Sequence, residues 1–90
     1  MLKTVSIIVT GKVQGVWYRQ SAKEKATELG VSGNVSNQPD GSVAIIVTGL
    51  ANQLDQFIEW CRQGPPRARV TNVEVTELPL QSFDRFVIER

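Results

Sequence analysis

The 90-residue chain contains no histidine, and this absence restricts its chemistry more than any other feature of its composition. Without histidine there is no Ser-His triad, no phosphohistidine intermediate, and no access to the commonest general base. The single cysteine, Cys61, has no partner for an internal disulfide, and the chain has too few ligands for a zinc site. Any catalysis must therefore use arginine, backbone amides, carboxylates or the substrate itself.

An excess of charge of either sign is also absent. Lysine plus arginine number 10 and aspartate plus glutamate number 9, so the net charge is +1. This balance does not indicate a nucleic acid or an anionic membrane as a partner, and any affinity for anions must be local. The sequence shows no leader pattern and no apolar run long enough to span a bilayer. We expect a cytoplasmic monomer with a single domain over residues 1–90.

Alternating apolar and polar residues predict the strands. Some of the segments show this alternation, and the others are bounded by turn residues, as strands usually are. The predicted strands are 4–10, 31–37, 42–49, 70–77 and 85–90. The second and third are joined by Pro39-Asp40-Gly41, a sequence typical of a tight turn because proline sets φ and glycine adopts positive φ.

Two amphipathic helices are predicted between these strands. The first covers residues 20–29 and ends at Gly30, and the second runs from Asn52, a plausible N-cap, to about Gln63. The resulting order, β-α-β-β-α-β with a short extra C-terminal strand, suggests a ferredoxin-like α+β sandwich. We expect an antiparallel sheet with both helices on one face.

This topology predicts where two functional segments meet. Right-handed crossovers make the first and second strands parallel, with the third strand inserted between them. The carboxyl ends of the first two strands then lie at the same edge of the sheet. Asn37, at the end of the second strand, is therefore expected beside the loop that leaves the first strand.

That loop, residues 11–19, has the features of an anion-binding cradle. Gly11 and Gly15 allow the backbone to approach a ligand, and a helix that begins near Arg19 leaves N–H groups without intrahelical partners. The Arg19 guanidinium adds a fork for two oxygens of a phosphate. The loop lacks the spacing of a Walker or dinucleotide motif, and two glycines and an arginine after a strand more often form only an ordinary turn. The candidate phosphate-binding residues are Gln14, Gly15, Val16, Trp17, Tyr18 and Arg19.

Arg19 and Asn37 together suit a reaction that needs little acid-base help. They can bind a phosphoryl group and place one water molecule, but they provide neither a nucleophile nor a strong base. Acyl phosphates meet this condition because their leaving group is a carboxylate, with a reference pKa near ~4, that departs without being protonated. An alkyl phosphate ester would need a general acid that the sequence does not supply.

Two blocks of sequence resemble the signatures of the acylphosphatase family. The first is Gly11-x-Val13-Gln14-Gly15-Val16-x-Tyr18-Arg19, and the second is Gly33-Asn34-Val35-Ser36-Asn37 followed by Gly41-Ser42-Val43. Further similarity at Ala26-x-x-Leu29-Gly30, Gly64-Pro65 and Ala68-x-Val70 extends the resemblance over almost the whole chain.

The resemblance implies an activity and a site. It implies hydrolysis of the carboxyl-phosphate bond of small acyl phosphates, without metal or cofactor, and inorganic phosphate as a further small-molecule partner. Arg19 and Asn37 match the catalytic pair of the family. Arg19 and the loop amides would bind the phosphate, while Asn37 would orient water for in-line attack on phosphorus.

The sequence departs from the family pattern at a few positions. Asn34 replaces a usual aromatic residue and Ser36 a usual basic one, so apolar surface beside Asn37 and a positive charge near the site are expected to be missing. Tyr18 stands where phenylalanine is common, and its hydroxyl needs a partner if it is buried. Trp17 has two interpretations, as a wall for the acyl group or as an ordinary exposed loop residue.

An alternative function is open on the same fold, because the ferredoxin-like sandwich supports many activities. This alternative is a domain that binds phosphate or carbamoyl phosphate without catalysis. RNA binding is disfavoured, because the third predicted strand, residues 42–49, carries none of the aromatic residues that stack on bases.

Overall fold

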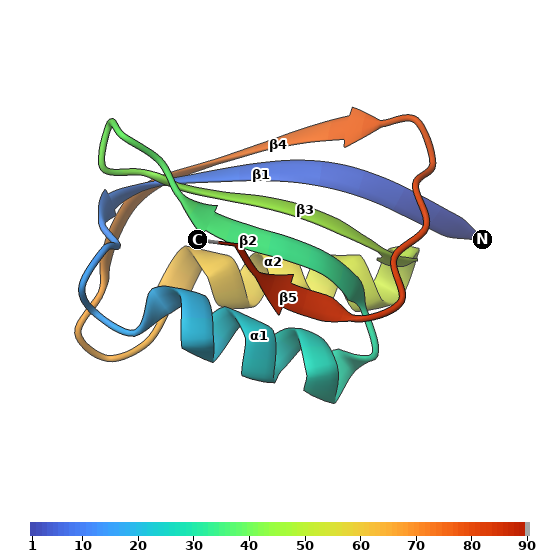
Figure 1. Ribbon diagram of the computed structural model, residues 1–90, viewed down its shortest axis with the longest axis horizontal. Helices are drawn as coiled ribbons and strands as arrows, with labels where there is room; N and C mark the ends of the chain where they lie inside the picture. The colour runs from blue at the N-terminus through green and yellow to red at the C-terminus, as the bar shows by residue number, and fades with distance from the viewer. Residues whose placement is uncertain (90) are drawn as a thin grey trace.

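Within residues 1–89, which the computed structural model describes, five strands form one sheet and two helices cover one of its faces (Figure 1). The strands lie in the order β4-β1-β3-β2-β5. The predicted ferredoxin-like α+β sandwich is therefore confirmed. The elements are β1 (Leu2–Lys12), α1 (Tyr18–Leu29), β2 (Ser32–Asn37), β3 (Val43–Leu50), α2 (Ala51–Gln63), β4 (Arg69–Leu78) and β5 (Phe86–Ile88).

The sheet topology confirms the predicted meeting of β1 and β2. β3 lies between them and is antiparallel to both, so β1 and β2 run in the same direction. Their carboxyl ends therefore lie at one edge of the sheet, where the β1–α1 loop and the β2–β3 turn are neighbours (Figure 1).

The expectation of a wholly antiparallel sheet was wrong for the last strand. β5 pairs in parallel with β2, with Gly33 opposite Phe86. The cause is the position where β4 ends: Leu78 lies opposite Thr4, near the start of β1. The connection after β4 crosses from this end of β1 to the other side of the sheet, beside β2. It arrives at the end of the sheet where β2 begins, so β5 runs parallel to β2. The predicted strand 85–90 is observed as Phe86–Ile88, and Arg90 lies outside the described residues.

The core lies between the sheet and the helices because the strands alternate. Successive residues of a strand point to opposite faces, so every second side chain of β1 and β3 faces α1 and α2. Complete burial of a valine or isoleucine side chain contributes roughly 1.5–3 kcal/mol, so this layer is the main source of stability. The buried apolar residues include Val5, Ile7, Val9, Val35, Val43, Ile45, Val47, Ala22, Ala26, Leu54 and Phe57.

The helix starts differ from the predicted ones. α1 begins at Tyr18, two residues before the predicted start, and ends as predicted at Gly30, which has φ 78°. The prediction that Asn52 caps α2 was wrong, since the capping position is Leu50. β3 leads directly into α2, and the Leu50 N–H donates to Gln53 Oε1 at 2.9 Å, the glutamine half of a capping box. Neither helix in residues 1–89 combines the length and hydropathy needed to cross a membrane.

Candidate active site

The β1–α1 loop has the backbone conformation of an anion nest. Gly15 has φ 73° and Trp17 has φ 67° and ψ 21°, and the residue between them, Val16, does not have positive φ. Alternation of this kind turns successive N–H groups toward one side of the chain, where they form a concave donor surface. Among residues 1–89, Trp17 alone has positive φ without being glycine.

The N–H groups of this loop have no partner among the described residues. The first backbone donor at the start of α1 with a carbonyl partner is Ser21, which donates to the Trp17 carbonyl at 3.0 Å. In residues 1–89 no hydrogen bond is donated by the N–H groups of residues 15–20. They are the unpaired donors expected at a helix N-terminus, and the positive end of the helix dipole lies with them.

The Gln14 side chain connects the loop to the β2–β3 turn. Its Nε2 donates to the carbonyl oxygens of Gln38 and Ser42, at 2.8 Å each. Both side-chain donors are used in this way, so only the backbone N–H of Gln14 remains as a candidate phosphate ligand. Asp40 closes the same turn, accepting from the Ser42 hydroxyl at 2.6 Å and from its N–H at 2.9 Å. These hydrogen bonds lower the pKa of the Asp40 carboxyl.

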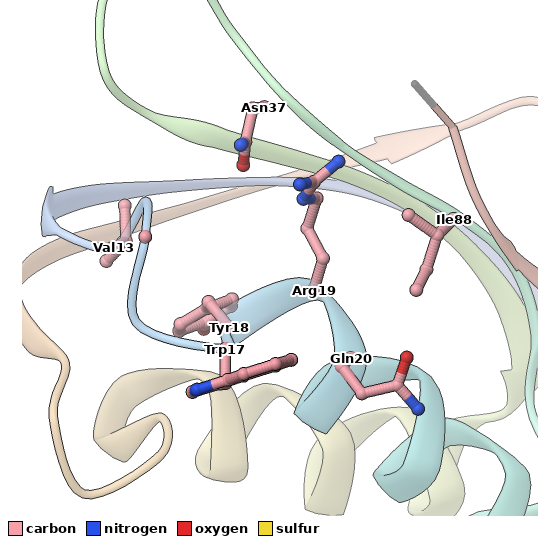
Figure 2. Close-up of a pocket in the computed structure, with 8 residues that line it drawn as sticks. Val13, Trp17, Tyr18, Arg19, Gln20, Asn37 and Ile88 are labelled. Carbon is pink, nitrogen blue, oxygen red and sulfur yellow. The ribbon is translucent and has the colours of Figure 1, made fainter.

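Arg19 and Asn37 meet between the loop and the sheet. Asn37 is on the same face of β2 as buried Val35, which directs its side chain toward α1. Figure 2 shows the Asn37 amide and the Arg19 guanidinium pointing toward each other. Within residues 1–89 no hydrogen bond or ion pair engages the guanidinium. Asn37 Oδ1 is buried and lacks a hydrogen-bond donor in this part of the chain.

These groups border a cavity of about 360 Å³. Of the predicted site residues, Gln14 and Val16 do not line it, because one side chain holds the turn and the other is buried in the core. Sequence reasoning missed Ile88, although the alternation of β5 places Ile88 with Phe86 on the face toward the helices. The lining residues are Val13, Gly15, Trp17, Tyr18, Arg19, Gln20, Asn37 and Ile88.

The Tyr18 hydroxyl points into the core and not into the cavity. It donates to the Cys61 carbonyl at 2.7 Å, which gives the buried phenol the partner that the sequence predicted it to need. The ring packs against Trp60, with centroids 5.4 Å apart. Burial raises the Tyr18 pKa far above its usual value, and burial raises the pKa of the Cys61 thiol to about 12. Tyr18 can therefore contribute its backbone N–H to the cradle, but not its hydroxyl.

Comparison with known proteins identifies the family. The model of the family described as Acylphosphatase matches residues 5–88. The chain belongs to the acylphosphatase family. One relative matches the chain nearly from end to end. A Methylococcus capsulatus protein named acylphosphatase is 48% identical over 90 residues, which cover 99% of this chain and 98% of that one.

Solved structures agree with this assignment. An acylphosphatase from Bacillus subtilis has a TM-score of 0.95 and 38% identity and covers both chains completely. An acylphosphatase from Coxiella burnetii has a TM-score of 0.95 and 34% identity over 98% of this chain and 93% of the other. The chain is therefore an acylphosphate phosphohydrolase, and catalysis is favoured over the alternative of binding alone.

Two departures from the family pattern, Asn34 and Ser36, do not line the cavity. Strand alternation places Asn34 and Ser36 on the face of β2 opposite the Asn37 side chain. Ser36 Oγ accepts a hydrogen bond from Gln38 Nε2 at 2.9 Å. Neither residue lines the cavity, so neither is expected to touch a ligand bound there, and their effect on activity stays a prediction.

Proposed function

We propose that the chain hydrolyses small acyl phosphates to a carboxylate and inorganic phosphate, with Arg19 and Asn37 as its catalytic residues. The observation that carries the proposal is that Arg19 and Asn37 line one cavity, together with residues of the β1–α1 loop whose N–H groups are unpaired among the described residues. A cationic fork, a row of N–H donors and a neutral amide are complementary to a phosphoryl group and one water molecule.

The loop is proposed to bind the phosphoryl group. Its N–H groups from Gln14 to Arg19 donate to the phosphoryl oxygens, and the helix N-terminus favours their negative charge. The Arg19 guanidinium binds two of these oxygens in the bidentate manner that its planar fork permits. Since charge shifts within the phosphoryl group during transfer, donors fixed before the reaction stabilise the transition state.

Asn37 is proposed to position the attacking water. Its buried Oδ1 accepts a hydrogen bond from the water, whose oxygen attacks phosphorus on the side facing β2. The bond between phosphorus and the acyl oxygen breaks, and its electron pair leaves with the carboxylate. The proton lost by the water passes to a phosphoryl oxygen. Because the leaving carboxylate has a reference pKa of about 4, its departure needs no general acid, and the proposed route uses no metal or cofactor.

The setting of this reaction is proposed from the same residues. The chain is proposed to act as a monomer with a single domain over residues 1–90. The unpaired, buried Cys61 suits a reducing cytoplasm. The small-molecule partners are then the acyl phosphate and the inorganic phosphate it releases, which binds to the same loop.

Release of phosphate from benzoyl phosphate in excess EDTA tests the proposal. The wild type should turn over, and Arg19→Lys should lose roughly 10²-fold in kcat/KM because a point charge cannot replace the bidentate fork. Arg67→Lys, the same change at an exposed arginine, is the control and should retain activity. Near-normal turnover by Arg19→Lys would remove Arg19 from the mechanism. A folded wild type that binds phosphate without hydrolysing benzoyl phosphate would instead favour the binding-domain alternative.

A further inference from the structure

The start of α1 lacks the side chains that usually hold a helix N-terminus in place. Its N-cap residue, Trp17, makes no side-chain capping hydrogen bond, and the first turn contains no acidic residue. The Trp17 backbone has φ 67°, a region that costs a bulky L-residue free energy. Helix ends without caps fray, and this end carries Arg19 and the unpaired N–H groups of the β1–α1 loop. Another contact has to hold it in one conformation.

Tyr18, the first residue of α1, makes that contact. Its side chain is buried, and its hydroxyl donates to the Cys61 carbonyl at 2.7 Å. Cys61 lies in the last turn of α2, and the residue four positions later is Pro65, which has no N–H to donate to this carbonyl. The hydrogen bond therefore supplies the donor that the end of α2 lacks and ties it to the start of α1. Figure 2 shows the Tyr18 and Arg19 side chains leaving α1 in different directions, so the anchor does not occupy the guanidinium.

The ring of Tyr18 is also held by its neighbours. Trp60 packs against it, with ring centroids 5.4 Å apart. Gly64, the C-cap of α2, lies so close that a Cβ added there would be 2.8 Å from Tyr18 Cε2. A ring packed this closely on both sides has little rotational freedom, so the backbone that carries it is fixed as well.

We infer that Tyr18 is a positioning residue for the reaction, because its hydroxyl and ring hold the start of α1 where the loop N–H groups and Arg19 can bind a phosphoryl group. The inference rests on the proposed function, since it concerns how that site is held ready. Without the hydroxyl bond, the start of α1 is expected to leave the binding conformation for part of the time. A site that is competent for only a fraction of the time binds its ligand more weakly by that fraction.

The binding of a ligand shifts such a loop back to the competent conformation. A saturating substrate should therefore restore the site of a Tyr18 variant, so KM should change while kcat does not. This pattern is the reverse of the one expected when a group acts only in the transition state, which lowers kcat.

The test compares the wild type with Tyr18→Phe, which keeps the ring and removes the hydroxyl. An NMR titration with inorganic phosphate at constant ionic strength gives Kd, and steady-state hydrolysis of benzoyl phosphate gives KM and kcat. We expect Kd and KM to rise together by about fivefold, the factor that corresponds to one hydrogen bond, with kcat changed less than about twofold. Gly64→Ala reaches the same ring from α2 and should raise Kd and KM at least as much, because the added methyl group collides with the ring.

The matched control separates positioning from general stability. Val47 is fully buried and pairs with Val5 and Gly33, toward the end of the sheet away from the cavity. Val47→Ala should destabilise the fold at least as much as the loss of one hydroxyl, yet leave Kd and KM unchanged. All measurements are made well below the melting temperature of each variant.

Two results would overturn the positioning role. One is an unchanged Kd for phosphate in Tyr18→Phe, and the other is an equal rise in Kd in Tyr18→Phe and Val47→Ala. A wild type that binds phosphate but hydrolyses no acyl phosphate would overturn the proposed function instead. The Kd values would then still decide whether Tyr18 holds the loop in its binding conformation.

Discussion

At the scale of single residues, the site depends on one atom that its own chain leaves without a partner. Asn37 Oδ1 is buried, and within residues 1–89 no donor reaches it. A buried carbonyl oxygen without a hydrogen bond costs about 1–3 kcal/mol, so a structural role alone does not account for Asn37. An acceptor held in this way is already oriented when a water molecule binds, which is what positioning for attack requires.

Asn37→Ala should therefore separate catalysis from binding and from stability. We expect kcat for benzoyl phosphate to fall roughly 10²-fold, because water positioning acts in the transition state. Inhibition by inorganic phosphate should stay within about threefold, because the loop donors that bind it are untouched. The melting temperature should not fall, since the variant removes an unpaired buried oxygen.

The matched control for this variant is Asn34→Ala, on the opposite face of the same strand, which should retain activity. A variant of Asn37 that loses phosphate affinity with kcat preserved would contradict the water-positioning role. It would mean that Asn37 binds the phosphoryl group directly.

The residues themselves were only partly predictable. Arg19 and Asn37 could be selected from the sequence, because one ends the glycine-containing loop and strand topology brings the other beside it. The side-chain contacts of Gln14 and Tyr18 could not, because their hydrogen bonds reach across 24 and 43 positions of sequence. Hydrogen-bond partners so far apart in the sequence are set by how the helices and strands pack together. Local sequence patterns do not predict this packing.

At the scale of elements, the site is assembled from a loop and a turn that belong to different strand pairs. The Gln14 side chain joins them through two hydrogen bonds to the carbonyls of Gln38 and Ser42. Asn37 immediately precedes that turn, so this contact sets the separation between the phosphate loop and the residue that holds water. Catalysis is sensitive to that separation, since a displacement of about 1 Å costs up to roughly 10²-fold in rate.

Gln14→Glu tests this connection. A carboxylate cannot donate, and it would face the two carbonyl oxygens that the amide now satisfies. We expect unfolding in urea to show a loss of about 2–3 kcal/mol, and kcat/KM for benzoyl phosphate to fall about tenfold or more. Gln56→Glu places the same charge on an exposed position of α2 and serves as the control. If the two variants behaved alike, the loop and the turn would not depend on Gln14.

The elements were predicted better than their ends. Periodicity identified the strands and helices, because burial of one face imposes it. The start of α2 was missed because a polar residue was expected at the N-cap position. The structure has Leu50 there instead, and the Gln53 side chain in the first turn accepts the Leu50 N–H. The parallel pairing of β5 was missed because it depends on where the β4–β5 connection crosses the sheet.

At the scale of the whole molecule, that crossing is anchored far from the site. At the start of β1 the Thr4 and Thr48 hydroxyls are 2.6 Å apart, and both contact the backbone of Gln81 in the β4–β5 connection. After this connection β5 pairs with β2. Ile88, the last residue of β5, then lies at the cavity at the other end of the sheet. The C-terminal strand thereby links the far edge of the fold to the site.

The packing of α1 against α2 makes the stability of the molecule dependent on pH. The buried Tyr18 phenol is protonated in the folded state, since burial raises its pKa above the usual 10.0. Burial likewise raises the pKa of Cys61 from 9.0 to about 12. Unfolded chains lose these protons first, so the stabilisation is complete below about pH 9 and declines as pH rises, by up to about 1.4 kcal/mol per pH unit for each proton.

The chain contains one tyrosine, so tyrosinate absorbance reports Tyr18 alone. We expect this absorbance to appear only as the fold is lost at alkaline pH, in step with the loss of helical circular dichroism. Tyr18→Phe isolates the tyrosine contribution, because the free energy of unfolding of this variant should fall less steeply above pH 10. At neutral pH the variant should be about 1 kcal/mol less stable, through loss of the hydrogen bond to the Cys61 carbonyl. Tyrosinate absorbance that rises near pH 10 with the fold intact would show that the phenol reaches solvent, and the close packing of α1 on α2 would have to be revised.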